Sequence, residues 1–250
     1  MNRFFIFLSI IIVSACKSKT NEVITAQSVV DKSIEVSGGA LYKTTTRSFV
    51  FRDIEYISEN KDGKQILKRI IDNDTSIIVD ILNNQKFERY INDKIVQVAD
   101  SMAVKYSNSI NSVHYFANLP FGLNDPAVKK ELLGEVQLNG KNYHKVKVTF
   151  EQKDGGVDYD DTYVYWFNST TFKPEYLAYE YHTDEGGMRF REAFNERNVN
   201  GIRFVDYNNY KTKDMNVSIL KIDSLFESGS LELLSKIELK NIEVNLDSYN

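Results

Sequence analysis

Hydrophobic and polar residues follow two different periods along the chain, and these separate predicted helices from predicted strands. Residues 24–37 carry apolar side chains at helical spacing, and Thr25 suits the start of a helix and Gly38 its end. The apolar positions share one face: Ala26, Val29, Val30 and Ile34. The chain therefore predicts a helix close to its N-terminus.

Helical spacing returns in the middle of the sequence. Residues 99–117 predict a second helix, whose apolar face consists of Met102, Tyr106, Ile110 and Val113. Residues 126–133 predict a short third helix, because Asp125 and Pro126 suit a helix start and Gly134 suits a helix end.

The rest of the chain follows the strand pattern, with β-branched and aromatic residues in short runs. Before residue 99 these runs are residues 46–58, 64–72, 76–82, 86–91 and 95–98. After residue 135 they are residues 143–151, 159–167, 175–183, 188–195, 202–210, 215–223 and 236–245. Residues 143–151 alternate most strictly, with Val146 and Val148 on one face and Lys145 and Lys147 on the other.

Short turns join these predicted strands. Turn residues stand at 73–74, 92–93, 154–156, 184–187 and 198–201. Consecutive strands with short turns form an antiparallel meander, and a sheet of about ten twisted strands curls. The sequence therefore predicts a mainly β (α+β) fold. We expect a strongly curved antiparallel sheet, or half-barrel, with two or three helices packed on its concave face.

The N-terminus has the pattern of an export signal. Arg3 precedes an apolar core over residues 4–13, broken only by Ser9. This core is shorter than the roughly 20 apolar residues of a membrane-spanning helix. The sequence "VSAC" at residues 13–16 resembles a bacterial lipobox, in which the cysteine receives a lipid and becomes the new N-terminus. The alternative is an ordinary signal peptide with an incidental cysteine, but Cys16 is the one cysteine of the chain and has no other cysteine to pair with.

This interpretation divides the chain into three parts. Residues 1–15 are the expected lipoprotein signal peptide, residues 16–23 the lipidated cysteine and tether, and residues 24–250 a single β-rich half-barrel domain. Two or more acyl chains hold a protein stably on a membrane, so the membrane is an expected partner. Lys17 and Lys19 follow the cysteine in place of an acidic run. We therefore expect a lipid-anchored envelope protein that faces the periplasm, on the outer rather than the inner membrane.

Charge excludes one class of partner. Lys and Arg total 31 and Asp and Glu total 35, interspersed along the chain. A nucleic-acid-binding protein concentrates basic residues on one face, so no nucleic-acid partner is predicted.

Motifs of common enzymes and cofactor sites are absent from the sequence. It contains no G-x-S-x-G, Walker loop, H-E-x-x-H or dinucleotide fingerprint. The three histidines, His114, His144 and His182, are far apart, and we predict no metal site, no cofactor and no catalytic residue.

One dense group of acids stands next to a predicted strand. Asp158, Asp160 and Asp161 do not fit a calcium loop, because Tyr163 and Ser169 occupy the positions of its glycine and its glutamate. They suit a solvated strand start, and the alternatives are a weaker cation site or a pair of hydrolytic carboxylates.

A second polar group stands on a later strand. Arg189, Arg191 and Arg197 share one face, opposite Met188 and Phe190. These arginines can grip an anionic ligand or pair with acids on neighbouring strands.

Five stretches together carry a resemblance to a known family. They are "HYFANLPFGLNDPAV", "LNGKNYHKVKVTF", "GGVDYDDTYVYWFN", "EYLAYEYH" and "GGMRFREAFNERNVNGIRFVDYNNY". The set resembles an uncharacterised family of Gram-negative envelope lipoproteins, defined as a domain of unknown function. Some members carry the label of a deoxyribose-phosphate aldolase, but that enzyme is a TIM barrel, which the predicted meander contradicts. At the level of fold, the chain is similar to Lol-type lipoprotein carriers.

Two functions remain open at this point, and an enzyme is a third and weaker alternative. The first is a non-enzymatic lipoprotein that binds a lipid or another hydrophobic ligand in a cavity. The second is a structural or protein-interaction lipoprotein of the envelope with a filled core. The candidate cavity residues are Phe49, Phe51, Tyr163, Tyr165, Trp166, Tyr179, Phe190 and Phe204.

Overall fold

The structure is a computed structural model, which describes residues 23–61, 64–83, 86–153, 159–182, 186–214 and 216–246. Cys16 and Asp158, and the predicted turn at residues 154–156, lie outside the described residues. None of the helices in the described part of the chain combines the length and the apolar character needed to cross a bilayer.

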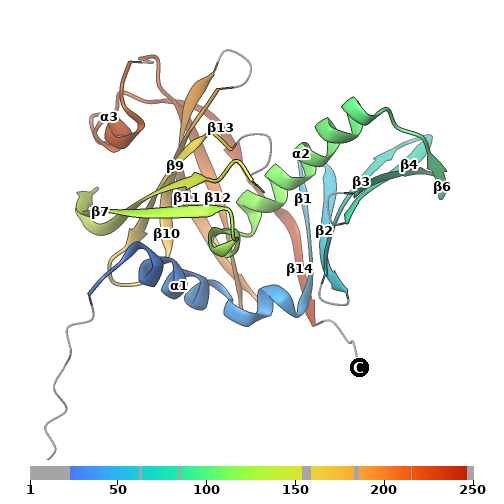
Figure 1. Cartoon of the computed structure of the whole chain (residues 1–250), viewed down its shortest axis with the longest axis horizontal. Helices are drawn as coiled ribbons and strands as arrows, with labels where there is room; N and C mark the ends of the chain where they lie inside the picture. The colour runs from blue at the N-terminus through green and yellow to red at the C-terminus, as the bar shows by residue number, and fades with distance from the viewer. Residues whose placement is uncertain are drawn as a thin grey trace, which may run out of the picture.

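Seven antiparallel strands form the first sheet, in the order β14-β1-β2-β3-β4-β5-β6 (Figure 1). Their bounds are β1 Thr45–Phe51, β2 Ile54–Lys61, β3 Lys64–Asn73, β4 Ser76–Asn83, β5 Lys86–Ile91, β6 Lys94–Val96 and β14 Lys240–Leu246.

Seven more antiparallel strands form the second sheet, in the order β13-β12-β11-β10-β9-β8-β7. Their bounds are β7 Val128–Leu138, β8 Lys141–Phe150, β9 Thr162–Asn168, β10 Pro174–Tyr181, β11 Gly187–Val199, β12 Ile202–Lys211 and β13 Glu232–Ile237. Neither sheet closes on itself, and the predicted mainly β half-barrel is confirmed.

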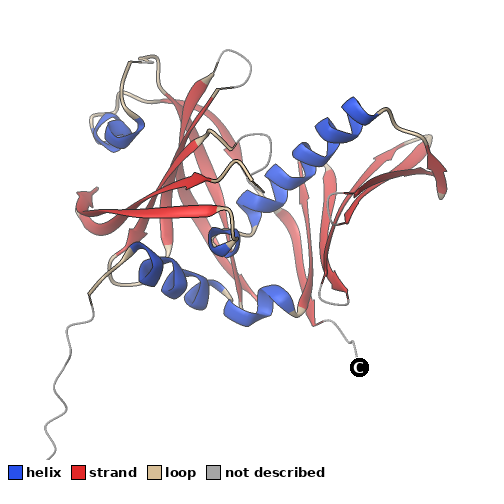
Figure 2. Cartoon of the chain, viewed as in Figure 1, coloured by secondary structure: helices blue, strands red, loops and turns tan. Residues whose placement is uncertain are grey.

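Three α-helices and three short 3-10 helices complete the described elements (Figure 2). The α-helices are α1 Ala26–Ser37, α2 Asp100–Ala117 and α3 Ile222–Glu227, and the 3-10 helices are η1 Gly39–Lys43, η2 Phe121–Asn124 and η3 Ile219–Lys221. The first two predicted helices are confirmed. The Thr25 hydroxyl accepts from the Ser28 amide, 3.0 Å away, and the backbone of Gly38 ends α1 as expected.

Two predicted elements before residue 134 are wrong. Residues 46–58 form two strands, because Arg52 and Asp53 both take positive φ angles and turn the chain between β1 and β2. Residues 126–133 contribute to strand β7 and not to a helix. The whole length of β7 pairs with β8, from Val128 with Phe150 onward, and this pairing overrides the local signal for a helix start.

The C-terminal predictions need two corrections as well. Of the strand predicted over residues 215–223, the described residues 216–223 form none, because Ile219 and Ile222 belong to η3 and α3 and pack on the second sheet. The single strand expected over residues 236–245 is two strands, β13 and β14, which lie in different sheets.

The second sheet carries an apolar core on each face. One face, together with β1, β2 and helices α1 and α2, forms the main core. The other face carries Trp166 and Phe190, which pack against Phe226 and its neighbours in η3 and α3. Figure 2 shows α3 set apart from the two longer helices, as this second core requires.

A carboxylate ties the two sheets together where the chain passes from β13 to β14. Asp206 of β12 accepts the backbone N–H of Leu239 at 2.9 Å, next to the start of β14. The same carboxylate accepts two hydrogen bonds from the Arg197 guanidinium, both 2.7 Å long, and one from the Asn195 amide. Because Asp206 is buried, these four donors replace the water that its charge would otherwise bind.

We expect Asp206→Asn to destabilise the protein by about 3 kcal/mol at neutral pH, because it leaves Arg197 without its carboxylate. Burial raises the pKa of the Asp206 carboxyl, but hydrogen bonds from Arg197 and the Leu239 amide outweigh it and hold the pKa below its usual value. The charged group therefore stabilises the fold above about pH 4, the pKa of an unfolded aspartate, and this contribution disappears as pH falls through the folded-state pKa.

Urea unfolding at pH 7 and at pH 3 measures this contribution. The difference between wild type and Asp206→Asn should shrink at the lower pH. Asp160→Asn, at an exposed aspartate, is the control and should change stability by less than about 0.5 kcal/mol. A variant as stable as wild type at pH 7 contradicts the role given to Asp206.

Candidate functional site

A cleft of about 950 Å³ opens between α2 and the two sheets. In Figure 1, α2 runs between the smaller first sheet and the second sheet. The first sheet contributes Phe51, Ile54 and Leu67 to the wall, and the second sheet contributes a row of aromatic residues. The cleft therefore has walls from both halves of the fold.

Aromatic side chains form the wall on the second sheet. Tyr163 of β9 and Tyr179 of β10 are register partners, and their rings stack with centroids 5.4 Å apart. The Phe150 ring meets the Tyr163 ring edge-on, at 5.6 Å. The hydroxyls of Tyr165 and Tyr115 lie 3.1 Å apart, which joins this wall to α2. The wall is apolar in its rings, and the two buried hydroxyls satisfy each other.

The structure places the eight predicted cavity residues in three locations. Phe51, Tyr163, Tyr165 and Tyr179 line the cleft. Phe49 and Phe204 lie within the main core, and Trp166 and Phe190 face the second core on the opposite side of the sheet. Neighbours along a strand point to opposite faces, so Tyr165 and Trp166 cannot share a wall.

The predicted polar residues are separated in a similar way. Asp161 is buried in the wall of the cleft, whereas Asp160 is exposed and lines no part of it. Arg191 lines the cleft, and Arg189 packs over the Tyr181 ring at 5.1 Å. The third arginine of this face, Arg197, forms the ion pair with Asp206.

Arg191 occupies an unusual position in the wall. Its Nη2 donates to the Tyr179 hydroxyl at 3.1 Å, and its guanidinium lies over the rings of Tyr179 and Phe116. Next to it on β12 is Asn209, 8% exposed, whose Nδ2 donates to Ser235 Oγ at 3.1 Å. Among the described residues, Arg191 Nε and Asn209 Oδ1 have no hydrogen-bond partner.

Sequence reasoning missed Asn209 and the cleft residues on α2. The predicted strand over residues 202–210 does contain Asn209, but only its pairing with Arg191 reveals that both face the cleft. Tyr115 and Phe116 fall outside the apolar helix face that was predicted from Met102 to Val113, and only the tertiary packing brings them to the cleft.

A buried ionic group fixes α2 to the first sheet. Asp80, with no exposed surface, bridges Arg69 at 2.5 Å and Arg89 at 2.6 Å. Arg69 also donates to Ser109 of α2, and the Arg89 guanidinium lies 3.9 Å from the centre of the Tyr106 ring. These contacts hold the helix that covers the cleft.

His114 of α2 is buried at the edge of the cleft, where its ring meets the stacked rings of Phe49 and Tyr56 edge-on. Burial lowers the pKa of its imidazole to about 4, and the Arg47 charge adds to this effect. A hydrogen bond between Nε2 and the Lys68 carbonyl, 3.2 Å long, acts in the opposite direction. The imidazole is therefore neutral at neutral pH.

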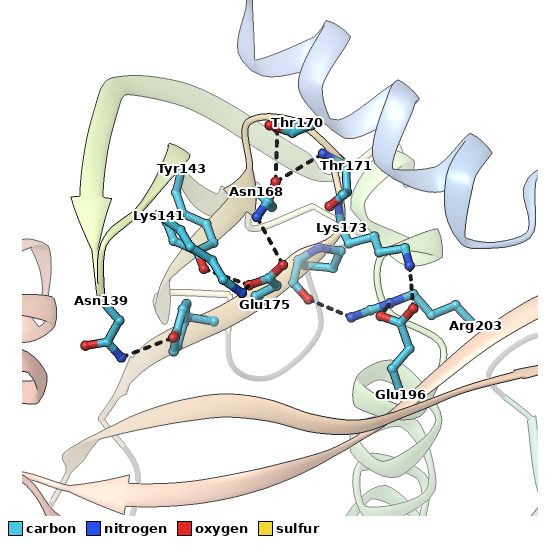
Figure 3. Close-up of polar contacts among 12 residues, drawn as sticks. Asn139, Lys141, Tyr143, Asn168, Thr170, Thr171, Lys173, Glu175, Glu196 and Arg203 are labelled. Carbon is cyan, nitrogen blue, oxygen red and sulfur yellow. Dashed lines mark hydrogen bonds and ion pairs between the residues drawn. The ribbon is translucent and has the colours of Figure 1, made fainter.

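A separate polar group lies at the turn between β9 and β10 (Figure 3). Glu175 accepts hydrogen bonds from the Tyr143 hydroxyl at 2.7 Å and the Asn168 amide at 3.2 Å. Glu196 accepts from Arg203 at 2.8 Å. None of these five residues lines the cleft, so the group stabilises strand ends. Within the described ranges, no cluster of His, Cys, Asp and Glu has the arrangement of a metal site.

Comparison with known proteins relates the chain to one family and to one fold. The model of a family of unknown function, DUF6503, matches residues 40–239. No curated protein matches the chain. A LolA superfamily protein from Nitrosomonas europaea has a TM-score of 0.50 at 11% identity, and the match covers 91% of this chain and 96% of that chain. At this identity the likeness shows a LolA-like fold, as the sequence predicted.

Two further solved structures are similar at lower scores. A DUF1329 family protein from Desulfovibrio piger has a TM-score of 0.41 at 10% identity, with 90% of this chain and 94% of that chain covered. A structure described as a putative outer membrane lipoprotein-sorting protein domain, from Vibrio parahaemolyticus, has a TM-score of 0.40 at 9% identity. The match covers 80% of this chain and 98% of that chain.

We expect His114 to make the protein less stable in acid. An unfolded histidine takes up a proton below about pH 6.5, whereas buried His114 does so only near pH 4. Stability should therefore fall as pH decreases from 6.5 to 4, by about 3 kcal/mol from this group. His114→Gln, which keeps a donor for the Lys68 carbonyl, should lose that part of the pH dependence.

Urea unfolding at several pH values between 7 and 4 measures the slope. His182→Gln, at an exposed histidine, is the matched control and should retain the wild-type slope. Equal slopes for wild type and His114→Gln contradict the assignment.

Proposed function

The chain belongs to the DUF6503 family, whose function is unknown, and we propose that it binds an apolar ligand, such as the acyl chain of a lipid, in the cleft between α2 and the two sheets. The observation that carries this proposal is the open cleft itself. Protein interiors pack to the density of organic crystals and leave few voids larger than a water molecule. A cleft of about 950 Å³ with half-buried Tyr163 and Tyr179 on its wall is therefore not a filled core.

The size and chemistry of the cleft suit an aliphatic chain. Ligand pockets commonly have volumes of about 300–1,000 Å³ and mostly apolar walls. Each methylene transferred from water to such a wall gains about 0.8 kcal/mol. The rings of Phe51, Tyr163 and Tyr179 provide this surface from both sheets. Polar side chains such as Gln65, Asn108 and Arg191 also line the cleft, and the Tyr115 and Tyr165 hydroxyls already bond to each other.

The proposed role is binding and not catalysis. An aldolase of the type named for some members is a TIM barrel of parallel strands, whereas this fold consists of antiparallel sheets. The LolA-like fold supports a carrier-type role by analogy only, and analogy of fold is a weak argument for function.

We also propose that Cys16 is lipidated and holds the protein on an envelope membrane, on the outer membrane facing the periplasm. Nine residues lie between Cys16 and Ala26, the start of α1, so ten residue steps join the two. A fully extended chain of that length spans at most about 35 Å. An anchor at Cys16 therefore keeps the cleft close to a source of lipid.

One observation favours a second function, an interaction with another envelope protein. Ile77 on β4 and Ile95 on β6 are 49% and 67% exposed, and the register of β4, β5 and β6 places them on the same face of the first sheet. Exposed apolar side chains on one face of a sheet are a feature of interaction surfaces. Under this alternative, the protein carries no ligand and its partner is recoverable by crosslinking.

Native mass spectrometry of the protein with an unacylated N-terminus, followed by organic extraction, separates the two functions. We expect a stoichiometric apolar molecule in the wild-type cleft. An empty cleft in protein purified from the envelope, together with no binding of the neutral probe N-phenyl-1-naphthylamine, contradicts ligand binding.

A tryptophan placed in the cleft should weaken binding of this probe. Ser112 is exposed on the side of α2 that lines the cleft, so Ser112→Trp adds a large ring to the cleft without entering the core. We expect about tenfold weaker binding, equivalent to about 1.4 kcal/mol. Ser101→Trp makes the same substitution on α2 at an exposed position away from the cleft and should bind as wild type does. Equal losses in both variants contradict the location of the site.

Lipidation of Cys16 is tested by growth with an alkyne-bearing fatty acid. Wild type should incorporate the label and Cys16→Ala should not, because the thiol is the acylated group. Ser18→Ala, in the same tether, should be labelled as wild type is. Label retained by Cys16→Ala contradicts the lipobox interpretation.

A further inference from the structure

Two neighbouring polar side chains interrupt the aromatic wall of the cleft. Arg191 of β11 and Asn209 of β12 are register partners, and both line the cleft. Their row continues through Leu177 to Tyr165 on one side and to Ser235 on the other. Adjacent strands are about 5 Å apart, so one small group can contact both side chains.

Arg191 lacks the acidic partner that three other buried or half-buried arginines have. Arg69 and Arg89 pair with Asp80, and Arg197 pairs with Asp206. Among the described residues, no carboxylate forms an ion pair with Arg191, and its guanidinium lies between the rings of Tyr179 and Phe116. Its Nε also has no hydrogen-bond acceptor there. A cation held against an apolar wall is costly without a counter-charge, and an anionic ligand supplies one.

Asn209 can supply a second donor to the same ligand. Its amide is more than nine-tenths buried, and Oδ1 has no partner among the described residues. The other end of the amide bonds to the Ser235 hydroxyl, which can donate as well as accept. Turning the amide over therefore keeps the bond to Ser235 and directs Nδ2 to the ligand.

Charges of both signs lie near this point of the cleft. Arg189 stands two residues from Arg191 on the same strand face. Its register partner is Lys211, whose Nζ forms an ion pair with the Glu232 carboxylate at 3.6 Å. Two carboxylates also line the cleft, Asp125 and Asp161. Asp161 precedes Tyr165 by four residues, about 13 Å along an extended strand, so it is remote from the Arg191 row.

We propose that the ligand is an amphiphile with an anionic head, a carboxylate or a phosphate, that binds to Arg191 and Asn209 while its tail lies along the aromatic wall. This inference rests on the proposed function, because it assumes that an apolar chain fills the cleft. It refines the proposed function by naming the class of ligand, an anionic amphiphile. A neutral alcohol of the same chain length lacks the group that Arg191 recognises.

Calorimetry with matched ligands tests the head group. The protein is the full chain carrying Cys16→Ala, delipidated and refolded from urea, with its circular dichroism checked. Laurate and dodecyl phosphate should bind about tenfold or more tighter than dodecanol, as hydrogen bonds to a charged group imply. Acetate and inorganic phosphate should bind far more weakly than laurate, because they lack the tail.

Variants locate the contact. Arg191→Met keeps an unbranched stem against the rings and should abolish the advantage of laurate over dodecanol, leaving dodecanol within about twofold of wild type. Arg191→Lys keeps the charge and should retain part of the advantage. Arg52→Met removes an exposed arginine on the opposite wall of the same cleft and should retain all of it.

The outcomes separate this inference from the proposed function. If neither laurate nor dodecanol binds, the proposed function fails. If both bind equally, or if Arg191→Met keeps the full preference for laurate, the cleft binds apolar chains but the anionic head is wrong. If inorganic phosphate or acetate binds as tightly as laurate, the site recognises a small anion and the amphiphile is excluded.

Discussion

The cleft has walls on both sheets and therefore depends on the contacts that hold the sheets together, among them the buried Asp206 carboxylate. Asp206 receives the amide of Leu239 at the point where the chain leaves one sheet for the other, and it neutralises Arg197 at the same time. Each wall of the cleft belongs to a different sheet. Asp206 thus supports the arrangement of the two walls, although it lines no part of the cleft itself.

The second sheet divides its two faces between stability and binding. The face toward η3 and α3 is closed by packing around Trp166 and by the ion pair between Lys145 and Asp223. The other face is only partly covered, since α2 lies over it and leaves Tyr163 and Tyr179 half-buried. Because the first face is fully packed, the protein can leave space on the second without losing the sheet.

Local pattern predicted most of the secondary structure, and tertiary pairing explains the exceptions. Alternation and turn residues located the hairpins, and helical spacing located α1 and α2. Residues 126–133 carry a sound start signal for a helix, but β8 offers eleven-residue strand β7 a partner along its whole length. Half of the predicted cavity residues lie on the cleft, because composition identifies aromatic strands and cannot assign a face. The sequence could not identify Asn209 as a cleft residue for the same reason, since only the register of β12 places it beside Arg191.

The single tryptophan of the chain has a spectroscopic consequence. Trp166 has no exposed surface, and its indole N–H donates to Asp223 on the side of the sheet away from the cleft. Its emission therefore follows the integrity of the second sheet, whereas a ligand on the opposite face leaves its surroundings unchanged. The protein thus contains an internal fluorescent reporter of folding that is separate from the reporter of occupancy, the tyrosines of the cleft wall.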